Sequence, residues 1–294
     1  MAKVLFVNPM IREEDDPRHV PYGMALLAAI AAREGHLVQV YDANAWRAPD
    51  AVLAQILKAD RWDVIGIGGI TTAYRSIKHV VQMAKAVAPH ALVVAGGGFL
   101  TSMPHDIMRL VPQIDIGVVG EAFVTFPEVL GRLDTGNRDW AQVPGIVWRD
   151  GGGRSRLNPE RALIQDLDGL PYPAWDLFPL DVYFKNSMAL FSEEGMLARR
   201  RLDVNASYGC SLICRFCFHL GIAGDLAHIA GRDGERDVTF THKRLIRYHS
   251  PRYVVDLVKH ARDRFGVDFI GFLDENLMTM HQSSGKTWLT EIAR

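Results

Sequence analysis

Cysteine is scarce in this sequence, and charge of neither sign predominates. Among 294 residues there are three cysteines, Cys210, Cys214 and Cys217, which excludes a small protein held together by disulfides. The 33 Lys and Arg residues are balanced by 34 Asp and Glu residues, and the formal net charge is -1. The composition therefore offers no support for general binding to nucleic acid or to anionic membranes.

Long apolar runs are also missing. The longest, within residues 23–32, is far shorter than the roughly 20 residues that span a bilayer. After Met1 the chain passes through a short apolar run into Asn8 and Pro9, without the features of a secretory signal. We therefore expect no membrane span, a cytoplasmic location and, from the length, about two domains.

Apolar runs alternate with amphipathic stretches in the first 135 residues. Five strands are predicted, over residues 4–7, 38–41, 63–67, 91–94 and 114–119. These runs lack a period of two, which is typical of a parallel sheet covered on both faces. The stretches between them carry apolar stripes at helical spacing. The pattern predicts a doubly wound, five-stranded parallel α/β domain with its ligand at the carboxyl ends of the strands.

The chain is predicted to have three parts. Residues 1–138 form the α/β domain, residues 139–200 a linker, and residues 201–294 a second α/β portion. Within the linker, two short strand-like runs flank a glycine-rich turn at residues 150–153, which predicts a hairpin. In the third part we place two strands, over residues 202–206 and 269–273.

The three cysteines follow the strand predicted at residues 202–206, with the spacing Cys-x3-Cys-x2-Cys. Closely spaced thiolates of this kind hold three irons of a 4Fe-4S cluster and leave the fourth iron open. The alternative is a structural zinc site with His219 as fourth ligand. A second Cys-x2-Cys or Cys/His unit, which zinc knuckles usually have, is missing from the sequence.

This cysteine spacing resembles that of the radical S-adenosylmethionine (SAM) enzymes. The resemblance implies that SAM chelates the open iron, and that an electron from the cluster cleaves SAM to a 5′-deoxyadenosyl radical. It also implies cofactor-binding roles for Phe216, just before the third cysteine, and for Asp274, Glu275 and Asn276, which follow the second strand of this part. A carboxylate there suits the ammonium group of the SAM methionine.

Glycine-rich segments follow three strands of the first domain. The candidate ligand-binding residues in them are Thr71, Thr72, Gly96, Gly97, Gly98, Thr101, Gly120 and Glu121. Glycines let the backbone approach a large ligand, and the hydroxyls can bond to it, although glycines also serve simply as turns. A dinucleotide site does not fit, because the third glycine of its motif is missing, and a phosphate loop at residues 285–287 lacks its first glycine.

Residues 21–29, Gly35-His36, these glycine turns and the linker together resemble the cobalamin-binding domain fused ahead of many radical SAM domains. The resemblance implies cobalamin with its nucleotide tail in the sheet crevice and its corrin ring facing the cluster. A histidine binds cobalt in the Asp-x-His-x-x-Gly motif of other cobalamin proteins. His19 lies in the corresponding loop at a different spacing, either as a cobalt ligand or as an ordinary surface residue.

The relatives are class B methyltransferases and anaerobic Mg-protoporphyrin ester cyclases, so the resemblance implies methyl transfer from methylcobalamin to an unactivated carbon or phosphorus centre. Oxidative cyclisation of a tetrapyrrole-type substrate is the alternative, and a non-catalytic cobalamin- or zinc-binding protein is a third possibility. Methylthiolating radical SAM enzymes carry three further cysteines that this chain lacks.

A small-molecule substrate and an electron donor such as a flavodoxin or ferredoxin are the implied partners. Residues 202–294 are too few for six β/α units of about 30 residues each. We therefore expect an incomplete partial barrel in a truncated gene product or fragment. Such a chain is expected to bind cobalamin but to be inactive unless a second polypeptide completes the barrel.

Overall fold

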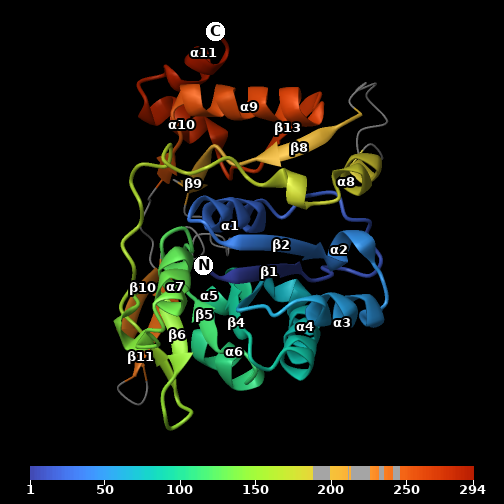
Figure 1. Ribbon diagram of the computed structural model, residues 1–294. Helices are drawn as coiled ribbons and strands as arrows, with labels where there is room; N and C mark the ends of the chain where they lie inside the picture. The colour runs from blue at the N-terminus through green and yellow to red at the C-terminus, as the bar shows by residue number, and fades with distance from the viewer. Residues whose placement is uncertain (188–198, 211, 213–225, 232–234, 241–245) are drawn as a thin grey trace.

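A seven-stranded sheet forms the centre of the protein (Figure 1). The computed structural model describes residues 1–187, 199–210, 212, 226–231, 235–240 and 246–294. The strand order is β2-β1-β3-β4-β5-β6-β7. The first five strands are β1 Lys3–Asn8, β2 Leu37–Asp42, β3 Val64–Gly68, β4 Leu92–Gly96 and β5 Ile116–Val118. They are parallel, as the sequence predicts, so their carboxyl ends meet at one edge.

The predicted hairpin is present and extends this sheet. Its strands, β6 Ile146–Arg149 and β7 Ser155–Leu157, are antiparallel, and β6 pairs antiparallel with β5. A segment that the sequence assigns to the linker therefore supplies two strands of the central sheet. The pairing depends on contacts with β5, which is distant in sequence, so the local turn signal predicts the hairpin and not its attachment.

Helices cover both faces of the sheet. Those of the first part are α1 Tyr22–Arg33, α2 Ala43–Trp46, α3 Asp50–Ala59, α4 Tyr74–Val87, α5 Gly98–Thr101, α6 Pro104–Leu110 and α7 Thr125–Asp134. Leu5 and Val7 of β1 pack with α3, α4 and α6, whereas Val4 and Phe6 pack with α1 and α7. Burial on both faces explains why the strands are apolar runs without a period of two.

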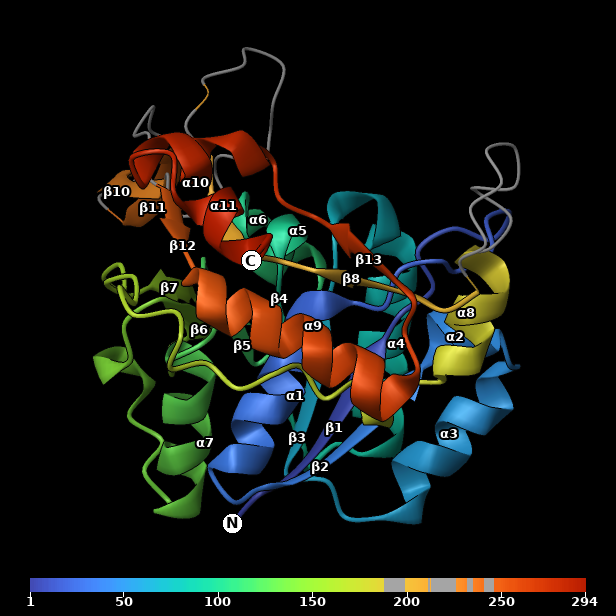
Figure 2. The same cartoon turned by 90° about the horizontal axis from the view of Figure 1, so that it is seen from above.

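Helix α1 is shared between two cores. Its Ala28 and Ala31 pack against the sheet, whereas Leu26 and Ile30 pack against the linker and the third part of the chain. Figure 1 shows α1 between the sheet and β8, and Figure 2 shows α9 running over it. The longest apolar run of the sequence is therefore a helix buried on two sides, as an all-round apolar helix requires.

The third part of the chain contains more strands than the sequence predicts. The expected pair is present as β8 Arg201–Val204 and β13 Phe269–Phe272, which are parallel. The prediction of only two strands is wrong, because β9 Ser207–Gly209 pairs with β12 Ile246–Tyr248 and β10 Leu226–Ala230 pairs with β11 Arg236–Phe240. Strands of three to five residues with mixed polar side chains give too short a pattern for periodicity to detect.

Helices complete the connector and the third part. They are η1 Thr71–Ala73, η2 Trp140–Gln142, η3 Trp175–Leu177, α8 Leu180–Ser187, α9 Pro251–Phe265, α10 Leu277–Ser283 and α11 Trp288–Ile292. Trp175 of the connector is fully buried with α1 and α9. Within the described ranges, no helix combines the length and the apolar character that crossing a membrane would require.

The β10–β11 hairpin lies against the edge strand β7. Arg156 of β7 forms an ion pair with Glu235, and Arg236 donates a hydrogen bond to the Leu157 carbonyl at 3.3 Å. The His105 ring contacts both sides, with Ser155 Oγ at 2.7 Å and the Arg236 carbonyl at 2.6 Å. The third part of the chain thus covers a sheet edge that would otherwise expose unpaired backbone groups.

Candidate functional site

The protein has two halves, the central sheet with its helices and the third part of the chain. A cavity of about 540 Å³ lies where these two halves meet. One wall is formed by the carboxyl ends of β1, β3, β4 and β5 and by the start of α1. The other wall comes from the segments around β9 and after β13, including Asn205, Tyr208, Cys210, Asp274 and Glu275. The sheet edge that the fold favours for ligand binding therefore faces the segment that carries the first cysteine.

Glycine backbone makes up much of the sheet-side wall. The glycines that line the cavity there are Gly66, Gly68, Gly69, Gly96, Gly97, Gly98 and Gly120. Gly97 has φ 95°, and a Cβ at this position would lie 2.5 Å from the carbonyl oxygen of Gly69. No other residue fits there, and the result is a smooth surface that a large flat ligand can approach closely.

The predicted threonines do not line this cavity. Thr71 and Thr72 are exposed on the η1 turn. Thr101 is buried, and its hydroxyl accepts a hydrogen bond from the Gly120 backbone N–H at 3.1 Å. Thr101 therefore fixes the turn after β5 and supports the cavity from behind.

Cys210 lines the cavity immediately after β9 and is half-buried. The Leu212 backbone N–H donates a hydrogen bond to Cys210 Sγ at 3.4 Å. Such bonds stabilise a thiolate and tune iron–sulfur clusters. The other predicted cluster residues, Cys214, Phe216 and Cys217, lie outside the described residues, as does His219. Among the described residues no group of three His, Cys, Asp or Glu side chains is arranged for a metal ion.

Asp274 and Glu275 line the same cavity as Cys210. Asp274 accepts hydrogen bonds from the Ser207 hydroxyl and, at 3.0 Å, from the Ala206 backbone N–H. Burial raises the pKa of Asp274, and these hydrogen bonds oppose that shift. Its carboxylate therefore organises the turn between β8 and β9. Asn276 precedes α10 and does not line the cavity.

Glu121 takes part in a buried ion pair that joins the two halves. The guanidinium of Arg247 on β12 binds Glu121 Oε1, and their side chains are 4% and 11% exposed. Burial raises the pKa of Glu121, and Arg247 lowers it. Arg247 and Tyr208, which are paired in the β9–β12 register, were not found by sequence reasoning. They belong to three-residue strands that carry no motif.

His19 contacts the second half of the protein and does not line the cavity. Its Nδ1 lies 2.5 Å from Oδ2 of Asp203, a buried residue of β8 that also pairs with Arg201. The His19 side chain is 50% exposed. In this arrangement His19 is a contact between the loop before α1 and strand β8.

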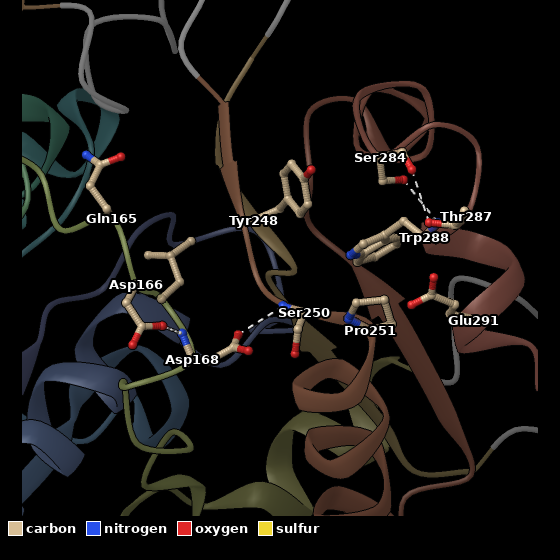
Figure 3. A pocket seen from close by; sticks show the side chains of 11 residues that line it. Gln165, Asp166, Asp168, Tyr248, Ser250, Pro251, Ser284, Thr287, Trp288 and Glu291 are labelled. Atoms are coloured by element: carbon tan, nitrogen blue, oxygen red, sulfur yellow. Dashed lines mark hydrogen bonds between the residues drawn. The ribbon is translucent and has the colours of Figure 1, made fainter.

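A second cavity, of about 370 Å³, lies between the linker and the C-terminal helices (Figure 3). Its polar groups hold local turns. Asp166 accepts a hydrogen bond from the Asp168 backbone N–H at 3.0 Å, and Asp168 accepts one from the Ser250 backbone N–H at 2.9 Å. None of the predicted site residues lies there, so the cavity at the sheet edge is the candidate site.

Comparison with known proteins gives matches to both halves. Residues 11–130 match the B12 binding domain family. An uncharacterized methyltransferase of Pyrococcus horikoshii, PH0819, is 34% identical over 67% of this chain and 40% of its own length. The cobalamin-dependent radical SAM methyltransferase TokK of Streptomyces tokunonensis is 26% identical over 67% of this chain and 28% of its own length.

An anaerobic magnesium-protoporphyrin IX monomethyl ester cyclase of Synechocystis is 26% identical over 82% of this chain and 47% of its own length. This chain thus spans less than half the length of each of these three relatives. Among solved structures, the radical SAM methyltransferase TsrM of Kitasatospora setae, with cobalamin and a [4Fe-4S] cluster bound, has a TM-score of 0.70 at 18% identity. The similarity covers 100% of this chain and 51% of TsrM, and it shows a shared fold.

Proposed function

We propose that this chain, which is similar to cobalamin-dependent radical SAM methyltransferases, binds cobalamin, a 4Fe-4S cluster and SAM around the cavity. We propose further that it takes part in methyl transfer to an unactivated carbon or phosphorus centre. The observation that carries the proposal is the composition of this one cavity. Glycine strand ends form one wall, and Cys210, Asp274 and Glu275 belong to the other. Cyclisation is the second candidate, which the similarity to the magnesium-protoporphyrin cyclase favours.

The glycine wall fits cobalamin. The turns after β3, β4 and β5 lack side chains where a broad ring system and its nucleotide tail would rest. Apolar side chains from Phe6, Leu27 and Phe126 close the same wall and exclude water from one side of the ligand. Gly120 and Glu121 bring backbone and carboxylate groups to the same cavity, where they would orient the cofactor.

The cysteine segment fits an iron–sulfur cluster, with Cys210, Cys214 and Cys217 as its three proposed ligands. The backbone of Leu212 already donates a hydrogen bond to Cys210 Sγ, so a charged sulfur is stabilised before any metal arrives. Phe216, just before the third cysteine, is proposed as a further cofactor-binding residue. When bound, the cluster with SAM supplies a carbon-centred radical and cobalamin supplies a methyl group.

Residues 274–276 are proposed to serve the methionine end of SAM in different ways. Asp274 holds the turn that leads through β9 to Cys210, so it positions the cluster segment. Glu275 lines the cavity beside it and would bind the ammonium group of SAM. Asn276, at the start of α10, would support this segment. We also propose a small-molecule substrate and a flavodoxin- or ferredoxin-like electron donor as partners. Thr71 and Thr72 would contact only those parts of a ligand that reach outside the cavity.

Anaerobic reconstitution of the full chain tests this proposal. We expect about four iron and four sulfide per chain, one bound cobalt after incubation with hydroxocobalamin, and conversion of SAM to 5′-deoxyadenosine once a reductant and any missing polypeptide are supplied. Cys214→Ala should remove iron and leave cobalt unchanged. Zinc retained in place of iron would contradict the cluster, and absence of cobalt would contradict the cobalamin site.

A further inference from the structure

Buried polar atoms on both walls of the cavity and directly behind them lack hydrogen-bond partners. Within the described part of the chain they include Glu121 Oε2, Asn205 Oδ1, Tyr208 Oη and Arg247 Nε, and Tyr22 Oη at the start of α1 is a further one. Glu121, Asn205 and Tyr208 line the cavity, and the Arg247 guanidinium binds Glu121 and lies 6.0 Å from the Tyr208 ring centroid. We call these four residues the junction cluster, because they come from both halves of the protein.

Unpartnered buried polar atoms are uncommon in folded proteins, and a bound ligand or water normally satisfies them. In the junction cluster, the Glu121 and Asn205 oxygens accept hydrogen bonds, the Arg247 Nε–H donates one, and the Tyr208 hydroxyl can do both. A group that both donates and accepts within a small volume matches this set. The primary carboxamide is the simplest such group.

We propose that the junction cluster binds a primary carboxamide at the edge of the corrin ring, with Glu121 accepting a hydrogen bond from the amide nitrogen. This inference rests on the proposed binding of cobalamin in the same cavity. Corrin rings carry several carboxamide side chains, so bound cobalamin would itself supply this group to the junction cluster. No second ligand is needed.

Arg247 is a positioning residue in this proposal. It donates one hydrogen bond to the Ile164 carbonyl at 2.7 Å and another to Glu121 Oε1. The hydrogen bond to Ile164 anchors the guanidinium to the linker. The hydrogen bond to Glu121 engages Oε1 alone, so Oε2 stays unpartnered. Burial raises the pKa of Glu121, and the charge of Arg247 opposes that shift and so favours the ionised form, which accepts hydrogen bonds.

The test uses the full chain, hydroxocobalamin, and the set of cobalamin monocarboxylic acids in which each primary peripheral carboxamide in turn is hydrolysed. Each acid replaces an N–H donor with an anionic oxygen, which the Glu121 carboxylate would repel. We expect one acid to bind about tenfold more weakly than cobalamin or worse, and the others to bind within about threefold of it. No substrate is added, so discrimination identifies the corrin as the source of the carboxamide.

Variants then assign the discrimination to the cluster. Glu121→Gln keeps the size of the side chain and offers an N–H to a carboxylate, so the penalty for the disfavoured acid should largely disappear. Arg247→Met should reduce that penalty, and Arg247→Lys should restore much of it. Glu128→Gln is the matched control, since Glu128 pairs with Arg161 away from the cavity, and should leave the penalty unchanged.

If hydroxocobalamin binds and all the monocarboxylic acids bind equally well, water occupies the junction cluster and this inference is wrong, while the proposed cofactor site stands. The same holds if Glu121→Gln folds, as judged by thermal unfolding, and still discriminates like the unchanged chain. If hydroxocobalamin itself fails to bind, the proposed function is wrong and the inference falls with it.

Discussion

At the scale of single residues, Gly23 allows the cavity to be filled without disturbing the fold. It lies in the first turn of α1 and lines the cavity, and an added Cβ would have no atom within 4 Å. Gly23→Phe is expected to weaken hydroxocobalamin binding by roughly tenfold or more, because the ring would occupy the ligand volume. Equilibrium dialysis measures the effect.

Gly23→Ala is the control for this prediction. A methyl group takes little of the cavity, so binding should stay within about twofold, and the better helix propensity of Ala should raise stability by up to about 1 kcal/mol. Equal binding by the Phe variant and the unchanged chain would show that the ligand does not approach α1.

His249 should make the stability of the protein depend on pH. Burial lowers its pKa to about 4, although Asp168 partly opposes the shift, so the folded state takes up this proton less readily than the unfolded state. Stability is therefore constant above the unfolded pKa of about 6.5 and declines as pH falls from there toward 4. Between pH 7.5 and 5 the loss from this residue should be about 2 kcal/mol.

His249→Asn tests this expectation through urea unfolding at the two pH values. The variant is less stable at pH 7.5, because it loses the ring stacked on Tyr253. It should also show a smaller loss of stability between pH 7.5 and 5 than the unchanged chain. An identical pH dependence in both proteins would assign the effect to other groups.

The residues of the candidate site differ in how far the sequence predicts them. Gly96, Gly97 and Gly120 follow apolar strands directly, and parallel strands end at one edge, so a local pattern suffices. Thr71 also follows a strand, but the short η1 turn leaves it exposed and outside the cavity lining. Arg247 depends on pairing with β9 across a long stretch of chain, which no local pattern records.

At the scale of elements, the join between β5 and the hairpin is tightly packed. A Cβ at Gly117 of β5 would lie 2.6 Å from a methyl carbon of Leu100 and 2.6 Å from one of Val147 on β6. Gly117→Ala should therefore lower the free energy of unfolding by about 1–3 kcal/mol through overpacking. Urea titration followed by circular dichroism gives the value.

Gly131→Ala provides the matched comparison. Gly131 lies within α7, where an added Cβ has no atom within 4 Å, so this change should be neutral or stabilise by about 0.5–1 kcal/mol. Destabilisation of the same size in both variants would mean that contact with Leu100 and Val147 does not decide the outcome at Gly117.

The elements that the sequence predicts well are the long or strongly apolar ones. Most of the five parallel strands are continuous apolar runs, and helices α3, α4, α7 and α9 each carry several apolar residues at helical spacing. The strands β9 and β12 have three residues each, and their identity comes from the partner strand. Tertiary pairing therefore fixes the elements that the sequence pattern leaves open.

At the scale of the whole molecule, α1 should make the two halves unfold together. Leu26 of α1 is 1% exposed and packs in the same core as Trp175 of the connector, Val204 of β8 and Leu257 of α9. Leu26→Ala should cost about 2–5 kcal/mol. Because both halves depend on this core, calorimetry and circular dichroism should show one coincident transition. Two separated transitions would contradict the shared core.

The cavity at the meeting of the halves has a thermodynamic consequence. Its walls belong to segments far apart in the chain, so a ligand that fills it contacts both halves at once. If the ligand binds more tightly when the two halves are joined, it stabilises the joined state by the same free energy, because coupling between two equilibria is reciprocal. A substitution at the Arg247–Glu121 contact that weakens this coupling would therefore reduce, by the same free energy, the stabilisation of the joined halves by the ligand and the gain in ligand affinity from their joining.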